Sequence, residues 1–505
     1  MAQNKNLWNS IQLKKPAKSK FDLSHDVKMS CNMGELVPIM NVEVLPGDKF
    51  NISNQNLIRF APMIAPVMHR MDVSTHYFFV PNRIMWDGWE KFIVDDPTAG
   101  AHPIIEASSL LTAAQKRYAG YYGVPIIPAA KLDQNINAFP FCAYNKIYNE
   151  YYRDQNLQSK LVDTLTDGLN DSADFLTMKY RAWEHDYFTS SLPFAQKGAA
   201  VDIPLGTVET IAMVKTTTSV GVALVDALHG HNQDVPSLPH PPLAADQLYA
   251  DTKGLPITPT TINDLRRAYS LQKWLEKNAR AGTRYVESLM AHFFVKAQDS
   301  RLQRPEYICG SKSPVIVSEV LNNTNILDQA PQGTMAGHGI ATTAGNHGSY
   351  YAQEHGWIIG VMSVLPKPAY QQGFEKNYLK TDFLDYAFPE FANIGEQAVE
   401  NREIWPSFTD QNVAEGTFGY VPRYSEYKYK KSIVAGNFLD NLDYWHLGRI
   451  FNSQPALNSD FIECKVAETT RIFAVTDDTV DHLFCQVVNN VSVVRALPFY
   501  GTPSI

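Results

Sequence analysis

The clearest regular feature of the chain is an alternation of apolar and polar positions, which is the spacing of a β-strand with one buried face. It runs through residues 42–52, interrupted by a Pro-Gly-Asp turn sequence, and returns at residues 71–79. Residues 357–365 form a nearly continuous apolar run and are a further strand candidate. These segments predict strand, turn, strand at the start of the chain and further strands beyond it.

Shorter runs of the same kind continue toward the C-terminus. They lie at residues 289–295, 461–466 and 471–475, and a terminal pair at residues 483–488 and 491–494 flanks Asn489-Asn490. We read the two asparagines as a turn between two strands. Strands are therefore predicted from one end of the chain to the other.

The segments between the strands are too long for hairpin loops and show other patterns. Residues 141–155 place aromatic and apolar side chains at helical spacing. Thr261, with Asp264 three residues later, is typical of the start of a second helix. Residues 198–259 and the glycine-rich residues 331–351 show little periodicity, and both are predicted to be loops.

Strands at both ends, with helices in long connections, favour a mainly β fold over the regular strand-helix alternation of a parallel α/β sheet. The specific prediction is an eight-stranded antiparallel jelly roll, a β-sandwich with large helical and loop insertions. We expect residues 31–505 to form a single domain of this kind.

Charge is unevenly distributed along the 505 residues. The first 20 residues contain five lysines and no acid, whereas the whole chain carries a net charge of −8, so the remainder carries −8 − 5 = −13. We define residues 1–30 as a basic N-terminal arm. A polar, cationic tail is either a solvated, disordered segment or a contact for nucleic-acid phosphates, and both interpretations stay open here.

The cysteines and the apolar runs bear on the compartment. The chain has five cysteines, which are scattered and lack C-x-x-C spacing, so neither a disulfide framework nor a zinc site is expected. Folding in a reducing cytoplasm is the simpler interpretation. No apolar run approaches the roughly 20 residues that span a bilayer.

Three segments invite a chemical interpretation, and each has a simpler one. His229-Gly230-His231, with His240 nearby, has metal-ligand spacing but lies in a predicted loop. Residues 310–313 (GSKS) lack the Walker pattern, and residues 183–186 (WEHD) favour a local turn network. We therefore expect no enzyme activity, no metal and no cofactor.

Six blocks of sequence resemble the major capsid protein of the Microviridae, in particular the gokushovirus branch. They include HYFFVPNRIMWDGWEKF (76–92), RAWEHDYFTSSLPFAQKG (181–198) and FGYVPRYSEYKYK (418–430), and the others are residues 21–48, 301–310 and 442–451. The blocks are long, specific and in the same order as in the family.

The resemblance implies a jelly roll of which sixty copies close a T=1 icosahedral shell around a circular single-stranded DNA genome. It implies a small, tailless bacteriophage without a virion membrane, folded and assembled in the cytoplasm of its bacterial host. We assign residues 198–259 to the surface-exposed protrusion at the three-fold axes, which would help attach the virion to a host-cell surface receptor. An internal scaffolding protein and a minor pilot protein are further implied partners.

Two sets of residues are candidates for contacts in such a shell. For DNA binding they are Lys14, Lys15, Lys18 and Lys20. As aromatic anchors between subunits they are Tyr144, Tyr148, Tyr151, Tyr420, Tyr424 and Tyr427, for which ordinary packing inside the chain is an equal alternative.

Other classes of protein remain as alternatives. A metal-dependent or carbohydrate-binding jelly-roll enzyme would need a convergent His/Glu cluster on strands. A secreted adhesin would need an export signal. A cellular encapsulating protein would differ from a viral coat only in the nucleic acid inside its particles.

Overall fold

The computed structural model describes residues 17–107, 111–125, 128, 134–196, 262–281, 303–321 and 335–500. The chain divides into two compact units, one formed by residues 1–195 and 296–505 and the other by residues 196–295. Of the second unit, the described part is α6 (Ile262–Ala281), which confirms the helix predicted after Thr261. The first unit contains the other described helices and strands.

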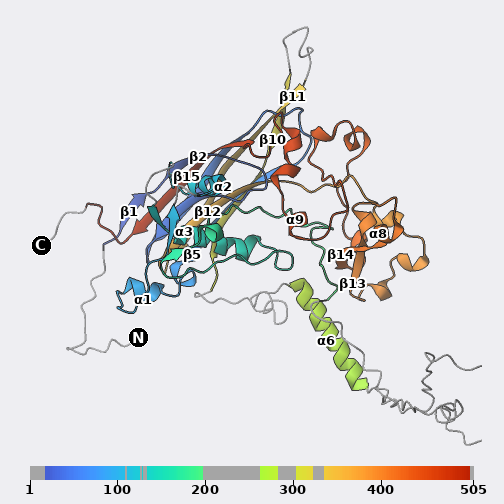
Figure 1. The fold of residues 1–505 in the computed structure, drawn as a ribbon, viewed down its shortest axis with the longest axis horizontal. Coiled ribbons are helices and arrows are strands. Elements are labelled where there is room, and N and C mark those ends of the chain that lie inside the picture. Colours follow the sequence, from blue (N-terminus) through green and yellow to red (C-terminus); the bar gives the residue numbers. More distant parts are fainter. Residues whose placement is uncertain are drawn as a thin grey trace, which may run out of the picture. The chain divides into compact units, whose positions relative to one another are not determined.

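Ten strands of the first unit form two antiparallel sheets (Figure 1). The six-stranded sheet contains β1 (Ser19–Asp22), β2 (His25–Cys31), β4 (Lys49–Phe60), β10 (Ile316–Leu321), β11 (Met335–Tyr351) and β15 (Leu483–Arg495). The four-stranded sheet contains β3 (Val37–Val44), β5 (Met71–Pro81), β9 (Glu306–Pro314) and β12 (Gly356–Pro366).

The order of the strands identifies the fold. Neighbours in one sheet are β2-β15-β4-β11 and in the other β3-β12-β5-β9, with β1 and β10 added to the first sheet. From β2 to β5 each strand lies in the opposite sheet from the one before it, as expected of eight strands wound into two Greek keys. The predicted mainly β, eight-stranded antiparallel jelly roll is thus confirmed.

The core of the sandwich lies between the two sheets. Every second residue of β4 and β15 is buried, for example Phe50 and Ile52 on β4 and Val487 on β15. These side chains meet buried residues of the facing sheet such as Val73 and Ile358. Burying each such side chain stabilises the fold by about 1.5–3 kcal/mol, which explains why the alternating pattern was readable in the sequence.

Long insertions connect the strands, as predicted. Residues 82–305 join β5 to β9, and they contain α1 (Trp89–Ile93), α2 (Ala113–Gly120), α3 (Phe139–Ile147), a π-helix (Tyr148–Tyr152), α4 (Ser172–Phe175) and a small sheet of β6 (Ile104–Ala107), β7 (Gln134–Asn137) and β8 (Leu169–Asn170). Residues 367–482 join β12 to β15, and they contain β13 (Glu396–Glu400), α8 (Gln411–Glu415), β14 (Thr417–Pro422), α9 (Ser459–Ile462) and several single 3-10 turns.

The first insertion covers the outer face of the four-stranded sheet. Phe78 of β5 and Ile359 of β12 are buried in a second apolar cluster with Phe141 and Tyr144 of α3. Figure 1 shows α3 beside β5 and β12. The four-stranded sheet is therefore buried on both faces, whereas the six-stranded sheet is buried on one.

Three predictions about strands were wrong. Residues 335–351 form β11 and not a glycine-rich loop, because their glycines lie where neighbouring groups leave no room for a side chain. Residues 461–466 and 471–475 form no strand: they hold the end of α9, parts of two 3-10 turns and two isolated β-bridges at Glu463 and Phe473, and α9 begins at an Asn458 cap that accepts a hydrogen bond from Phe461 N. Residues 483–495 form the single strand β15, because Asn489 lies inside it and bonds to Tyr77 and Ile39 instead of forming a turn.

The expected arm is also shorter than predicted. Residues 19–22 and 25–31 belong to β1 and β2, which pair with β15, and Phe21, Val27 and Met29 pack against the sandwich core. This apolar alternation was overlooked because the lysines dominate the composition of the segment. Residues 1–16, the predicted protrusion at 198–259 and the predicted strand at 289–295 lie outside the described residues.

Two further observations concern the compartment. All five cysteines are buried thiols, and the sulfur atoms of Cys31 and Cys485 lie 3.8 Å apart. Among the helices that the structure describes, none combines the length and the apolar composition needed to cross a bilayer.

Candidate assembly and nucleic-acid surfaces

The outer face of the six-stranded sheet is open to solvent. We call it the open face and define it by the outward residues of β1, β2, β4, β11 and β15. They are Lys20, Asp22, Asp26, Lys28, Lys49, Asn51, Ser53, Gln55, Leu57, Arg59, Thr342, His347, Ser349, Tyr351, Phe484, Gln486, Val488, Asn490, Ser492 and Val494, all of them half-buried or exposed. Amide and hydroxyl side chains dominate its middle, and the two ends differ from the middle and from each other.

One end of the open face is cationic. The pairing register aligns Lys20, Val494, Lys49 and Tyr351 across four strands. Lys18 lies beside this row, because its Nζ donates to Gly47 O at 2.6 Å and lies 5.8 Å from the centre of the Tyr351 ring. We call Lys18, Lys20, Lys49 and Tyr351 the cationic end.

The cationic end combines the two kinds of group that bind single-stranded nucleic acid, ammonium groups for phosphates and an aromatic ring for bases. Asp22 lies one row away, and hydrogen bonds from Ser24 lower its pKa, so its negative charge reduces the local positive charge. Lys18 and Lys20 of the predicted DNA set are thus brought together with two unpredicted residues. Lys14 and Lys15 lie outside the described residues.

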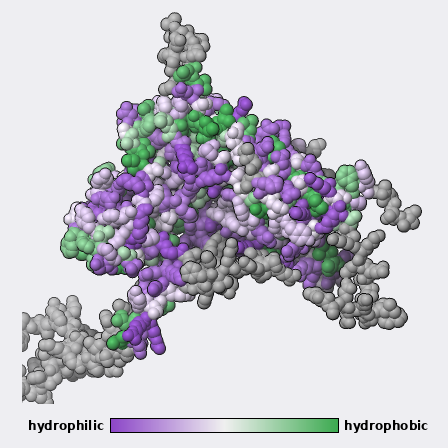
Figure 2. Space-filling model, turned by 180° about the vertical axis from the view of Figure 1, so that it is seen from behind, coloured by the Kyte–Doolittle hydropathy of each residue, from purple (hydrophilic) through white to green (hydrophobic). Residues whose placement is uncertain are grey.

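The opposite end of the open face is apolar. The register aligns Phe484, Arg59, Ile340 and Ile316 across β15, β4, β11 and β10. Phe484 is 51% exposed, Ile316 67% and Val320, four residues further along β10, 52%. Figure 2 shows hydrophobic residues gathered where β10 and β11 project from the molecule. We call Phe484, Ile340, Ile316 and Val320 the apolar end, which extends the open face along β11 and onto β10.

Three of the predicted aromatic anchors are core residues. Tyr144 is fully buried and its hydroxyl donates to Leu36 O at 2.8 Å. Tyr148 is 3% exposed and accepts a hydrogen bond from Gln158, and burial raises its pKa to about 12. Tyr424 is 6% exposed. These side chains pack inside their own chain and offer no surface to a neighbour, so the alternative of ordinary core packing applies to them.

The other three predicted anchors are accessible to different degrees. Tyr151 is 40% exposed and its hydroxyl donates to Pro305 O. Tyr420 is half-buried in β14, and Tyr427 is 54% exposed beneath Lys380, whose Nζ lies 3.8 Å from the ring centre. Their role between subunits stays a prediction.

An exposed aromatic segment of the second insertion was not predicted from the sequence. Tyr378, Phe383 and Tyr386 are 77%, 68% and 54% exposed, and Phe388 and Phe391 are also exposed. The stretch FLDYAFPEF has no regular period, and therefore gave no strand or helix signal. Its local density of aromatic residues was the available signal, since exposed aromatics are enriched at protein interfaces.

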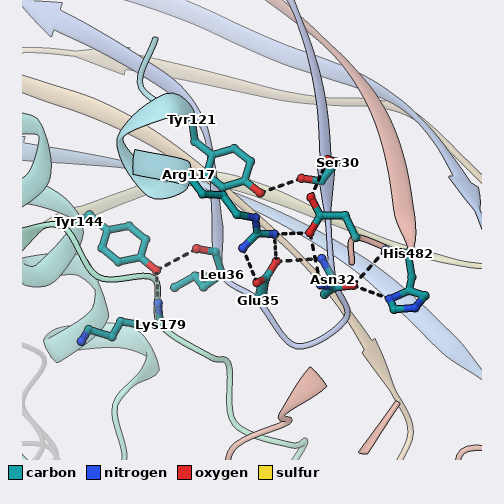
Figure 3. A network of polar contacts seen from close by, with 10 residues as sticks. Ser30, Asn32, Glu35, Leu36, Arg117, Tyr121, Tyr144, Lys179 and His482 are labelled. Atoms are coloured by element: carbon teal, nitrogen blue, oxygen red, sulfur yellow. Dashed lines mark hydrogen bonds and ion pairs between the residues drawn. The ribbon is translucent and has the colours of Figure 1, made fainter. Parts of the chain in front are cut away.

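A polar network fixes the first insertion to the sandwich (Figure 3). Arg117 of α2 donates to both carboxylate oxygens of Glu35 at 2.8 Å and to Asp481 at 2.6 Å. Burial alone would lower the pKa of Arg117, but the hydrogen bonds and charge of Glu35 outweigh it and raise that pKa. Asn32 joins the network by accepting from His482 N at 3.0 Å. The network holds α2 against the sandwich.

The titratable segment at residues 183–186 has the structural role predicted for it. Asp186 accepts hydrogen bonds from Phe188 N and Thr189 N, which closes a local turn. Burial opposes ionisation of Glu184, but hydrogen bonds from Lys312 and Lys367 outweigh it and lower the pKa of Glu184.

The remaining chemical candidates have ordinary places. Residues 310–313 lie in β9 and not in a phosphate-binding loop. His229, His231 and His240 lie outside the described residues, within which no group of three His, Cys, Asp or Glu side chains could hold a metal ion.

A jelly roll whose loops are enlarged into insertions, with exposed apolar and aromatic surfaces and, among the described residues, no cluster that could hold a metal, is typical of a protein of the shell-forming class. A family model described as "Capsid protein (F protein)" matches residues 9–505, and the chain belongs to this family.

Relatives of the chain agree with this assignment. The chain is 35% identical to "Capsid protein VP1" of Bdellovibrio phage phiMH2K, over 96% of this chain and 95% of that protein. It is 33% identical to "Capsid protein VP1" of Chlamydia phage 1, over 99% and 98%. A shorter match, 29% identity over 26% of this chain and 29% of the relative, joins it to "Capsid protein F" of Escherichia phage alpha3.

The resemblance seen in the sequence is therefore confirmed: this is a gokushovirus-like major capsid protein of the Microviridae. Its relatives are structural proteins and not enzymes. It assembles with copies of itself into the capsid of a virion.

Proposed function

We propose that sixty copies of this protein close a T=1 icosahedral shell around a circular single-stranded DNA genome. The observation that carries the proposal is the jelly roll itself, whose core lies between the two sheets while most buried residues of its long insertions form separate clusters. Loops of this kind supply heterologous contacts that turn through a fixed angle and close, without disturbing the sandwich.

The open face is the surface that we assign to the interior. The four-stranded sheet is already covered by the first insertion, whereas the open face is polar and has a cationic end. Lys18 and Lys20, together with Lys49 and Tyr351, would bind phosphates and stack on bases without regard to sequence. Lys14 and Lys15 precede these residues directly, and would extend the same contact along the basic arm, which we now limit to the residues before β1.

Three other roles are proposed on family resemblance alone. Residues 198–259 form the three-fold protrusion and take part in attachment to a receptor on the host cell. An internal scaffolding protein assists assembly, and a minor pilot protein assists delivery of the genome.

The test is electron microscopy of particles purified from expressing or infected cells, with nuclease-protected nucleic acid measured on the same sample. We expect closed icosahedral particles of sixty subunits that protect single-stranded DNA. Particles with another number of subunits would contradict the T=1 arrangement, and particles that protect no DNA from infected cells would contradict genome enclosure.

A further inference from the structure

The apolar end of the open face differs from the face it belongs to. Four residues along β4 from Lys49, the register aligns three polar residues across the sheet, Asn490, Ser53 and His347. At the other end of the face, it aligns Phe484, Ile340 and Ile316 with Arg59. Apolar residues scattered singly on a surface are ordinary, but a contiguous exposed group marks an interaction site. Arg59 is the one charged side chain in this row.

The strand that borders the apolar end also has a free edge. Within the residues that the structure describes, β10 pairs with β11 on one side and with no strand on the other. Ile316, Val320 and Leu321 are each at least half exposed. An exposed apolar edge strand is a template for pairing with another chain, and stable proteins cover such edges.

The hairpin of β10 and β11 is held firmly against the sandwich. A side chain added at Gly337 would lie 2.2 Å from Ala65 O, and one at Gly339 would lie 2.9 Å from the Phe60 ring. Gly337 also pairs with Met63 through backbone hydrogen bonds. The inner side of the hairpin is thus fixed by close backbone contact, so its outer side is a preformed surface.

We propose that the apolar end and the free edge of β10 bind a second copy of this chain in the assembled shell. The partner has to be a protein surface and not DNA, because the group is mainly aliphatic and aromatic: Arg59 is its one arginine or lysine, and Ser318 and His338 lie between Ile316 and Val320 on the same face. The cationic end, where DNA is proposed, lies about 33 Å away along β4, since Lys49 and Arg59 are separated by ten residues of one strand. A second copy is the protein that a self-assembling capsid chain is bound to meet.

This inference rests on assembly into a capsid and not on the number of subunits or on DNA. Wild-type particles with another number of subunits would contradict the T=1 proposal, but they would not contradict the proposed contact between copies of the chain.

The first test compares the double variant Ile316→Lys/Val320→Lys with the control Gln55→Lys, which adds a lysine to an exposed position in the middle of the same face. Each chain is produced with the other virion proteins, and the share of chain in shells is measured by sedimentation. Circular dichroism and thermal unfolding of the unassembled fraction report whether the chain is folded.

We expect the double variant to stay folded and to lose about tenfold or more of its shells, because charges placed in a packed interface stay desolvated and unpaired. The control is expected to assemble as the wild type does. Wild-type yields of shells from the double variant would overturn the proposal. If the double variant fails to fold, the milder change Val320→Thr is tested instead, because threonine keeps the branched shape of valine. The concentration of chain needed for assembly is then compared with that of the wild type, and an unchanged value would overturn the proposal.

Hydrogen exchange provides a second test on the unmodified protein. We expect the amides of residues 316–321 to exchange severalfold more slowly in shells than in the unassembled chain, because the free edge becomes covered. Protection that appears before any shell forms, on adding another virion protein to the unassembled chain, would overturn the proposal in favour of that protein. Equal exchange in shells and in free chain would overturn it as well.

Discussion

At the scale of single residues, the molecule depends on buried polar groups whose partners come from distant parts of the chain. Arg117 of the first insertion meets Glu35 before β3 and Asp481 before β15 (Figure 3). The Glu35 side chain is 4% exposed, so a buried negative charge there would be strongly destabilising without the ion pair with Arg117. A network of this kind makes the position of the insertion specific.

Replacing Arg117 by alanine should therefore destabilise the chain. The expected loss is about 1–3 kcal/mol, below the value for a fully buried pair because Arg117 is 35% exposed and water can partly replace it. Denaturant unfolding of the unassembled chain measures it. The matched control is Lys465→Ala, which removes the exposed pair with Asp460 and should cost less than about 0.5 kcal/mol. Equal losses in both variants would contradict the role given to the network.

Two buried histidines predict the response to acid. Burial lowers the pKa values of His69 and His76 to about 4, whereas both titrate at 6.5 in the unfolded chain. The unfolded state then binds more protons between pH 6.5 and pH 4, so these groups reduce stability progressively as pH falls through that window and have no effect above it.

We expect each of these histidines to contribute a loss on the order of 1–3 kcal/mol by pH 4, and His76→Gln to flatten the dependence. Unfolding free energies measured from neutral pH to pH 4 provide the test. His347→Gln, at an exposed position of β11, is the control and should leave the profile unchanged. A wild-type free energy that stays constant across the window would contradict the prediction.

At the scale of elements, the pattern of apolar residues located strands of both sheets, although only β4 among them has a single buried face. Residues 42–52, 71–79 and 357–365 lie in β3 to β5 and in β12 because apolar burial alone determined them. It could not locate β11, since its glycines, threonines and histidines carry little hydrophobic signal and its position is fixed by pairing with β4 and β10. Nor could it recognise Asn489 as a strand residue, because its partners Tyr77 and Ile39 come from the facing sheet.

The glycines of β11 give a prediction at this scale. Gly337→Ala should destabilise the chain by about 1–3 kcal/mol, because the added carbon would meet Ala65 O at 2.2 Å and the backbone has to move. Gly120→Ala is the control, since nothing lies within 4 Å of the added carbon, and the change should be neutral or slightly stabilising. Thermal unfolding of both variants decides this, and a neutral Gly337→Ala would show that the hairpin is not held by close contact.

At the scale of the whole molecule, the sequence indicated which kinds of group matter but not how they combine. The lysine-rich start of the chain pointed to Lys18 and Lys20, yet Lys49 and Tyr351 join them only because β1, β15, β4 and β11 pair in that order. The tyrosines were proposed as anchors because they lie in aromatic-rich segments, and this criterion does not distinguish the buried Tyr144 from the exposed Tyr427. The composition of the cationic end and the burial of each tyrosine both depend on contacts between residues far apart in the sequence.

The cationic end makes a quantitative prediction about DNA. Replacing Lys18, Lys20 and Lys49 by alanine should weaken binding of single-stranded DNA uniformly across sequences. It should also reduce the slope of log affinity against log salt concentration by about 0.7 for each phosphate that is no longer neutralised. Titrations of labelled oligonucleotides at several salt concentrations measure this. Arg59→Ala, at the apolar end of the same face, should keep the slope, and an equal reduction there would contradict the placement of the DNA site.

In the proposed shell, the open face of the jelly roll lines the interior. A cryo-electron microscopy reconstruction of genome-filled particles would show this face directly. We expect sixty copies, with β1, β2, β4 and β15 facing the interior, density for nucleic acid over Lys18, Lys20, Lys49 and Tyr351, and β10 covered by a neighbouring subunit. A shell in which the open face points outward, with internal density against the first insertion instead, would contradict it.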